Sequence, residues 1–82
     1  MPAMKARIVV TLKTGVLDPQ GKAIEAALKS FGIDEVSGVR QGKVFDLEVA
    51  SENREQAEAT LKAACEKLLA NTVVENYTVE IA

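Results

Sequence analysis

Apolar and polar residues alternate in three segments of the chain, and this two-residue period is typical of β-strands. The alternating apolar positions are Ile8, Val10 and Leu12, then Phe45, Leu47 and Val49, and finally Tyr77, Val79 and Ile81. A shorter β-branched stretch, 33–40, contains Val36 and Val39 and is followed by the turn-compatible pair Gln41–Gly42. The pattern therefore predicts four strands, with 33–40 and 45–49 paired as a hairpin.

The apolar period lengthens to three and four residues after Asp18–Pro19, which indicates a helix. Asp18 is a favourable N-cap, and Pro19 suits the first helical position because its missing N–H would have no partner there. The apolar stripe consists of Ile24, Ala27, Leu28 and Phe31. Gly32 supplies a left-handed stop.

A second helix is predicted after Asn53, which can cap it together with Gln56 in a capping box, with Ser51 as the alternative cap. Its apolar stripe consists of Ala57, Leu61, Ala64, Cys65 and Leu68. We expect the helix to end near Asn71.

The order β-α-β-β-α-β predicts an α+β, ferredoxin-like fold, with one four-stranded antiparallel sheet and both helices on one face. We expect residues 1–82 to form a single domain. The opposite face of the sheet would then carry Val9, Thr11, Val44, Asp46, Thr78 and Glu80. This mixture fits either a solvated surface or a contact between subunits.

The composition of the chain limits the classes of partner that we expect. Ten basic and twelve acidic residues give a net charge of −2, so the chain lacks the positive field that draws proteins to nucleic acid. No apolar run approaches the length of a membrane span, and the N-terminus lacks the apolar core of a signal peptide, so we expect a cytoplasmic protein. A chain of 82 residues buries only about 60% of its unfolded surface, which favours self-association as a homodimer or a tetramer.

The residues that carry chemistry are few. The chain has one cysteine and no histidine, so it offers no Cys/His metal site and no base to activate a nucleophile. Cys65 lies on an apolar stripe and is predicted to be a small core residue. The carboxylates have no surroundings that would raise their pKa values, and we therefore predict no catalytic site, metal site or cofactor in this chain.

The segment 15–21, G-V-L-D-P-Q-G, opens the first helix and could offer N–H groups to an anion, but it matches no phosphate-binding motif and places Asp18 where the anion would lie. A turn with a helix cap is the simpler interpretation. Leu17 is then expected to pack on the first helical turn as a hydrophobic staple, leaving Val16 to face outward.

Three runs together resemble one family. They are G-V-L-D-P-Q-G at 15–21, V-R-Q-G-K at 39–43 and C-E-K-L-L-A-N at 65–71. In this order and in a chain of this length they resemble PurS, the small subunit of phosphoribosylformylglycinamidine synthase of purine biosynthesis.

The resemblance implies a ferredoxin-like fold and a non-catalytic subunit. In that family a glutaminase, PurQ, releases ammonia from glutamine, and a synthetase, PurL, uses ATP and magnesium to activate formylglycinamide ribonucleotide. The resemblance places the partner-docking surface at Gly15, Val16, Leu17, Asp18, Pro19, Gln20, Gly21, Val39, Arg40, Gly42 and Lys43.

Two other functions are compatible with such a fold. One is a free-standing regulatory module that binds a small ligand, and the other is an acylphosphatase-like enzyme. The enzyme would need an arginine in a phosphate-binding loop after the first strand, and Gly15-Val16-Leu17 offers none.

Overall fold

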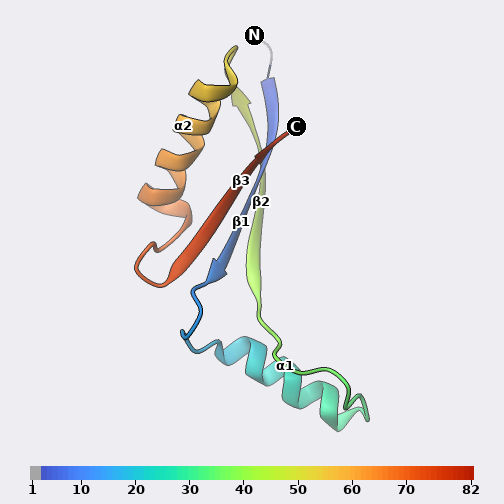
Figure 1. The fold of residues 1–82 in the computed structure, drawn as a ribbon. Coiled ribbons are helices and arrows are strands. Elements are labelled where there is room, and N and C mark those ends of the chain that lie inside the picture. Colours follow the sequence, from blue (N-terminus) through green and yellow to red (C-terminus); the bar gives the residue numbers. More distant parts are fainter. Residues whose placement is uncertain (1–2) are drawn as a thin grey trace.

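The computed structural model describes residues 3–82 (Figure 1). The elements are β1 (Ala3–Leu12), α1 (Pro19–Ser30), β2 (Gly42–Ala50), α2 (Arg54–Ala64), the π-helical turn η1 (Cys65–Leu69) and β3 (Glu75–Ile81). The strands form one antiparallel sheet in the order β2-β1-β3. The predicted α+β class is therefore confirmed.

The strand register separates an inner apolar face from an outer polar face. Ile8 on the central strand pairs with Phe45 on one side and with Val79 on the other, and all three lie on the inner face. The preceding residue, Arg7, pairs with Asp46 and Glu80 on the outer face. The two-residue alternation read from the sequence thus assigns each face correctly.

Helix α2 covers the inner face. Its Ala57 and Leu61, followed by Cys65, are buried above the central strand, where Ile8 and Val10 are also buried. Cys65 has no exposed surface, which confirms the prediction that it is a core residue.

The end of the second helix differs from the prediction. Residues 65–69 form a π-helical turn, in which the N–H of Ala70 donates to the carbonyl of Cys65 at 2.9 Å. The wider turn rotates the later residues relative to an α-helix. Leu69 is consequently half-buried against the core, whereas Leu68, predicted to lie on the apolar stripe, is 83% exposed.

The prediction that both helices cover one face of the sheet is wrong for α1. This helix lies beyond the end of the sheet and points away from it (Figure 1). Its only buried residue is Gly21, while Ile24 and Phe31 of the apolar stripe are exposed. The radius of gyration is 16.4 Å, against about 12 Å for a compact chain of this length. The apolar stripe is real, but the sheet of the same chain does not cover it.

The predicted strand at 33–40 is also absent, so the sheet has three strands rather than four among residues 3–82. This segment runs back along α1, and Gly38 adopts a positive φ of 66°. A strand requires a neighbouring strand to satisfy its backbone groups. Because α1 carries the segment away from the sheet, the segment finds no such neighbour in its own chain.

Both helix starts are confirmed. The side chain of Asp18 accepts a hydrogen bond from the N–H of Gly21, and that of Asn53 accepts from the N–H groups of Glu55 and Gln56. The second half of the predicted capping box is not formed, because the N–H of Asn53 donates to the hydroxyl of Ser51 instead.

Candidate functional site

The predicted docking residues lie on two connectors and on the first residues of the elements that follow them. One connector runs from the end of β1 into the first turn of α1, and the other returns from α1 to the start of β2. The described positions are Gly15, Val16, Leu17, Asp18, Pro19, Gln20 and Gly21, with Val39, Arg40, Gly42 and Lys43. The structure brings the two runs together, and we call the contact between them the root of α1.

Asp18 joins the two connectors. One carboxylate oxygen accepts from the N–H of Gly21 at 2.9 Å, which caps the helix, and the other accepts from the N–H of Gln41 at 2.7 Å. The residue is only 5% exposed. A single side chain thereby fixes both the start of α1 and the segment that leads into β2.

Arg40 and Glu25 tie the connectors at two further points. The guanidinium of Arg40 donates to the carbonyl of Val16 at 2.9 Å and to that of Lys13 at 3.1 Å. The carboxylate of Glu25 accepts from the N–H of Gly38 at 2.8 Å and from that of Val39 at 3.3 Å. The return segment is therefore held along the side of α1.

Gly21 allows the closest approach at the root. A Cβ atom at this position would lie 2.2 Å from the carbonyl oxygen of Val39, far inside any real contact distance. The need for glycine here comes from this crowding, because the φ of Gly21 is not among the positive values.

The two carboxylates at the root of α1, those of Asp18 and Glu25, already accept hydrogen bonds from backbone N–H groups. The N–H groups of Gln41 and Gly21 lower the pKa of Asp18, and those of Val39 and Gly38 lower the pKa of Glu25, because hydrogen bonds to a carboxylate favour its charged form. The carboxylate of Asp18 occupies the N-terminal end of α1. An anion would meet a negative charge there, which supports the interpretation of segment 15–21 as a turn with a helix cap.

Leu17 is the most accessible large apolar side chain of the predicted site, with 69% of its surface exposed, whereas Val16 is half-buried. The expected hydrophobic staple is therefore wrong, and the two residues have exchanged the places predicted for them. Lys43 points to the inner face of the sheet, where its ammonium group lies 3.6 Å from the carboxylate of Glu75.

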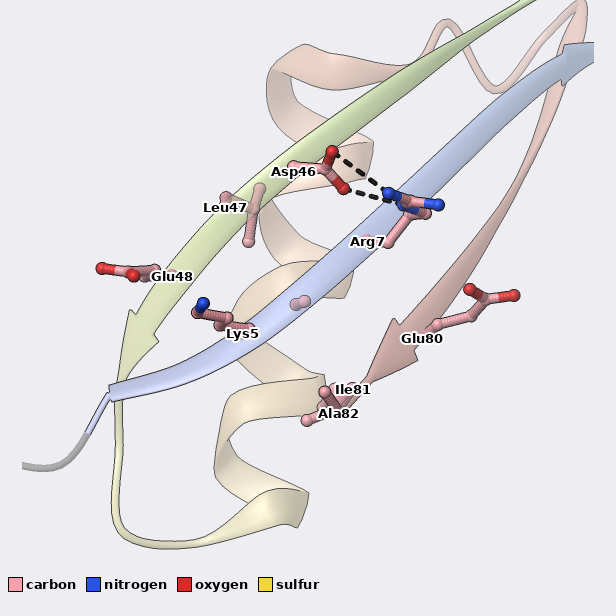
Figure 2. Close-up of a pocket in the computed structure, with 9 residues that line it drawn as sticks. Lys5, Arg7, Asp46, Leu47, Glu48, Glu80, Ile81 and Ala82 are labelled. Atoms are coloured by element: carbon pink, nitrogen blue, oxygen red, sulfur yellow. Dashed lines mark hydrogen bonds and ion pairs between the residues drawn. The ribbon is translucent and has the colours of Figure 1, made fainter.

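The outer face of the sheet is hollowed around an ion pair (Figure 2). Arg7 on β1 donates to Asp46 on β2 at 2.8 Å, which raises the pKa of Arg7 and lowers that of Asp46. Lys5, Glu48 and Glu80 surround the pair, and the hollow has a volume of roughly 750 Å³. Both paired side chains are more than half exposed, so the hollow is an open, charged surface.

The described residues offer little chemistry. Burial raises the pKa of the Cys65 thiol, which keeps it in the unreactive protonated form. No group of three or more potential metal ligands gathers anywhere in residues 3–82. No helix in that range has the length and apolar character needed to cross a membrane.

Two features of the site were not predicted from the sequence. The bonds from Gly38 and Val39 to Glu25 join residues 13 and 14 positions apart, and no local pattern marks them. The exposure of the α1 stripe also carries no sequence signal, because the same spacing is expected of a helix that packs on its own sheet.

Comparison with known proteins identifies the family. Residues 5–82 match the family model described as PurS: Phosphoribosylformylglycinamidine (FGAM) synthase. The chain is 46% identical over 77 residues to the phosphoribosylformylglycinamidine synthase subunit PurS of Bacillus subtilis, covering 94% of this chain and 90% of that protein. It is 47% identical over 75 residues to the PurS subunit of Synechocystis, covering 92% and 75%.

Solved structures agree. A chain in the structure of PurLQS from Thermotoga maritima superposes with a TM-score of 0.91 at 43% identity, covering all of both chains. PurS of Bacillus subtilis in its C2 crystal form superposes with a TM-score of 0.88 at 44% identity, covering 96% of this chain and 98% of that one. This chain belongs to the PurS family of phosphoribosylformylglycinamidine synthase.

Proposed function

We propose that this chain is the small, non-catalytic subunit of a phosphoribosylformylglycinamidine synthase in purine biosynthesis. The observation that carries the proposal is the full-length match to a chain of the Thermotoga maritima PurLQS structure. In this function the chain joins a glutaminase, PurQ, to a synthetase, PurL. The synthetase binds the ATP and magnesium, and this cytoplasmic chain needs no cofactor of its own.

The surface of the chain suits such a subunit. Exposed apolar side chains lie in two parts of the molecule, with Leu17 and Phe31 beside α1 and with Leu68 and Val73 near the end of α2. The apolar stripe of α1, with Ile24 and Phe31 exposed, is of the kind that normally packs against another surface. We propose that these surfaces are covered in the complex, by a second copy and by the larger subunits.

Residues at the root of α1 have two different roles in docking. Asp18 and Gly21 are buried, so they orient the surrounding surface and do not touch a partner. Leu17 projects from that surface and is the residue of the predicted site best placed to enter an apolar pocket of a larger subunit. Enclosing the path of ammonia between the two active sites would raise its effective concentration at the acceptor.

The deciding experiment mixes this chain with purified PurL and PurQ and measures the formation of phosphoribosylformylglycinamidine with glutamine as the nitrogen donor. We expect synthesis to depend on this chain. Reactions driven by free ammonia serve as the control, since they need PurL but no transfer from PurQ. Full glutamine-dependent synthesis in the absence of this chain would contradict the proposal.

A further inference from the structure

The turn between η1 and β3 is held by its own hydrogen bonds. The carbonyl of Asn71 accepts from the N–H groups of Val74 at 3.0 Å and of Glu75 at 2.8 Å. The side-chain oxygen of Asn71 accepts from the N–H of Val73 at 3.2 Å, and the N–H of Asn71 donates to the carboxylate of Glu75 at 2.6 Å. These bonds order the turn before any partner binds.

Val73 lies in the middle of this turn, and 80% of its surface is exposed. Its β-branched side chain has few rotamers, and the backbone that carries it is already fixed. Binding costs less entropy when the contacting side chain is ordered beforehand. Val73 is therefore well suited to enter an apolar depression of another protein.

A small polar hollow lies beside the turn, with a volume of roughly 340 Å³. It is lined by Lys13, Thr72, Glu75, Asn76 and Tyr77. The carboxylate of Glu75 is already occupied, since it accepts from the N–H of Asn71 and lies 3.6 Å from the ammonium group of Lys43.

The ammonium group of Lys13, by contrast, has no ion partner within residues 3–82. The charge that this chain leaves unpaired in the hollow is therefore positive. A carboxylate from outside the chain is the group that would complement it.

Lys13 also connects the turn to the root of α1. Its N–H donates to the carbonyl of Val74 at 2.9 Å. Its carbonyl accepts from the N–H of Val16 and from the guanidinium of Arg40, each at 3.1 Å. The turn and the root accordingly lie at the same end of the sheet, the end from which α1 extends (Figure 1).

We propose that the turn 71–75 and the hollow beside it form a second docking surface, for a larger subunit of the synthase. Val73 enters an apolar depression of that subunit, and Lys13 pairs in the hollow with a carboxylate at the border of the depression. The contact continues from the root of α1, where Leu17 projects, across Lys13 to the turn.

This inference deepens the proposed function and rests on it in one respect, that the chain binds a larger subunit. It adds Lys13 and Val73 to the docking surface. Neither residue lies in the three motif runs 15–21, 39–43 and 65–71, so the resemblance to the family did not indicate them.

The first test removes the apolar contact and measures the dissociation constant for a mixture of PurL and PurQ by biolayer interferometry. Val73→Ser should raise this constant by about 5-fold or more, because the apolar side chain is lost from the contact. Its melting temperature should stay near that of the wild type, since the bond from residue 73 to Asn71 uses the backbone N–H. Ala59→Ser, at an exposed position of α2, is the matched control and should bind normally.

The second test removes the charge and repeats the binding measurement at about 0.05 M and about 0.5 M NaCl. Salt should weaken binding of the wild type, because ions screen the pair formed by Lys13. We expect Lys13→Gln to bind less tightly at low salt and to respond less to added salt. The hydrogen bonds of Lys13 use backbone atoms, so the fold should be retained. Lys62→Gln, at an exposed position of α2, is the control and should keep the salt response of the wild type.

Wild-type affinity in both Val73→Ser and Lys13→Gln would overturn this inference. So would a change in the molar mass of either isolated variant by light scattering, because the surface would then belong to a second copy. If the wild type supports glutamine-dependent synthesis and neither variant binds more weakly, this inference alone fails. If the variants bind more weakly as expected but the wild type does not support that synthesis, the proposed function alone fails.

Discussion

The carboxylate of Asp18 accepts a hydrogen bond from the N–H of Gln41 at 2.7 Å while its second oxygen caps α1. These two residues lie 23 positions apart, and their contact connects the segment that enters α1 with the segment that leaves it. The direction of the helix relative to the sheet depends on this contact. Residues that were predicted to dock to a partner therefore have a structural role at the root of α1.

Replacing Asp18 with alanine should destabilise the root of α1. The variant loses the helix cap and leaves the N–H of Gln41 without its acceptor, so we expect the melting temperature to fall by about 5 °C or more. Asp18→Asn is the matched control, because asparagine is also a good N-cap and keeps one acceptor oxygen. Its melting temperature should lie between those of the wild type and the alanine variant. Equal melting temperatures for all three proteins would show that Asp18 does not fix the root.

Gly21→Ala tests the close approach at the root of α1. Alanine favours helix formation, yet its Cβ would collide with the carbonyl oxygen of Val39. We expect the free energy of unfolding, measured in urea, to fall by about 1–3 kcal/mol. Gln20→Ala, at the exposed neighbouring position, should change it little. A stabilised Gly21→Ala protein would mean that the two connectors do not touch as described.

Lowering the pH should destabilise the root of α1. The pKa values of Asp18 and Glu25 are lowered by hydrogen bonds from Gln41 and Gly21 and from Val39 and Gly38, respectively. A carboxylate whose pKa is lowered on folding contributes stability above its unfolded pKa, and that contribution is lost as the pH falls through the folded value. For these two residues the loss begins near pH 4–5, around the ordinary pKa values of Asp and Glu, and continues below it.

The measurement is the melting temperature between pH 7 and pH 2.5 for the wild type and for the double variant Asp18→Asn with Glu25→Gln. We expect the wild type to lose more stability than the variant on acidification, because the variant has no charge to lose at these positions. Parallel curves would assign the acid sensitivity to other carboxylates.

Leu17→Ser separates docking from folding at the predicted site. The side chain is 69% exposed, so the melting temperature of the isolated chain should stay within about 2 °C of the wild type. Retention of this chain by PurL and PurQ in a pull-down should fall. Thr14→Ser, at an exposed position of the same connector, is the control and should be retained normally. Unchanged retention of Leu17→Ser would remove Leu17 from the docking surface.

A loss of partner binding in an Arg40 variant would not by itself show that Arg40 contacts the partner. Its guanidinium donates to the carbonyls of Val16 and Lys13, so Arg40→Glu alters the root as well as the surface charge. We expect this variant to lose partner binding and thermal stability together. Lost binding with an unchanged melting temperature would instead point to direct contact between Arg40 and a partner.

The sequence by itself determined the local elements and their faces. Strand alternation placed Ile8 and Phe45 inside and Val9 and Asp46 outside, and the caps at Asp18 and Asn53 marked both helix starts. These features depend on neighbouring residues and on burial, which an amino-acid pattern expresses directly. The three motif runs also identified the family.

Only the tertiary structure decided where the first helix goes. An apolar stripe shows that Ile24 and Phe31 need cover, but it does not say whether their own sheet or another chain provides it. That choice rests on contacts between distant residues, above all Asp18 with Gln41 and Glu25 with Gly38. The same contacts removed the expected fourth strand, because a segment held beside α1 cannot reach the sheet of its own chain.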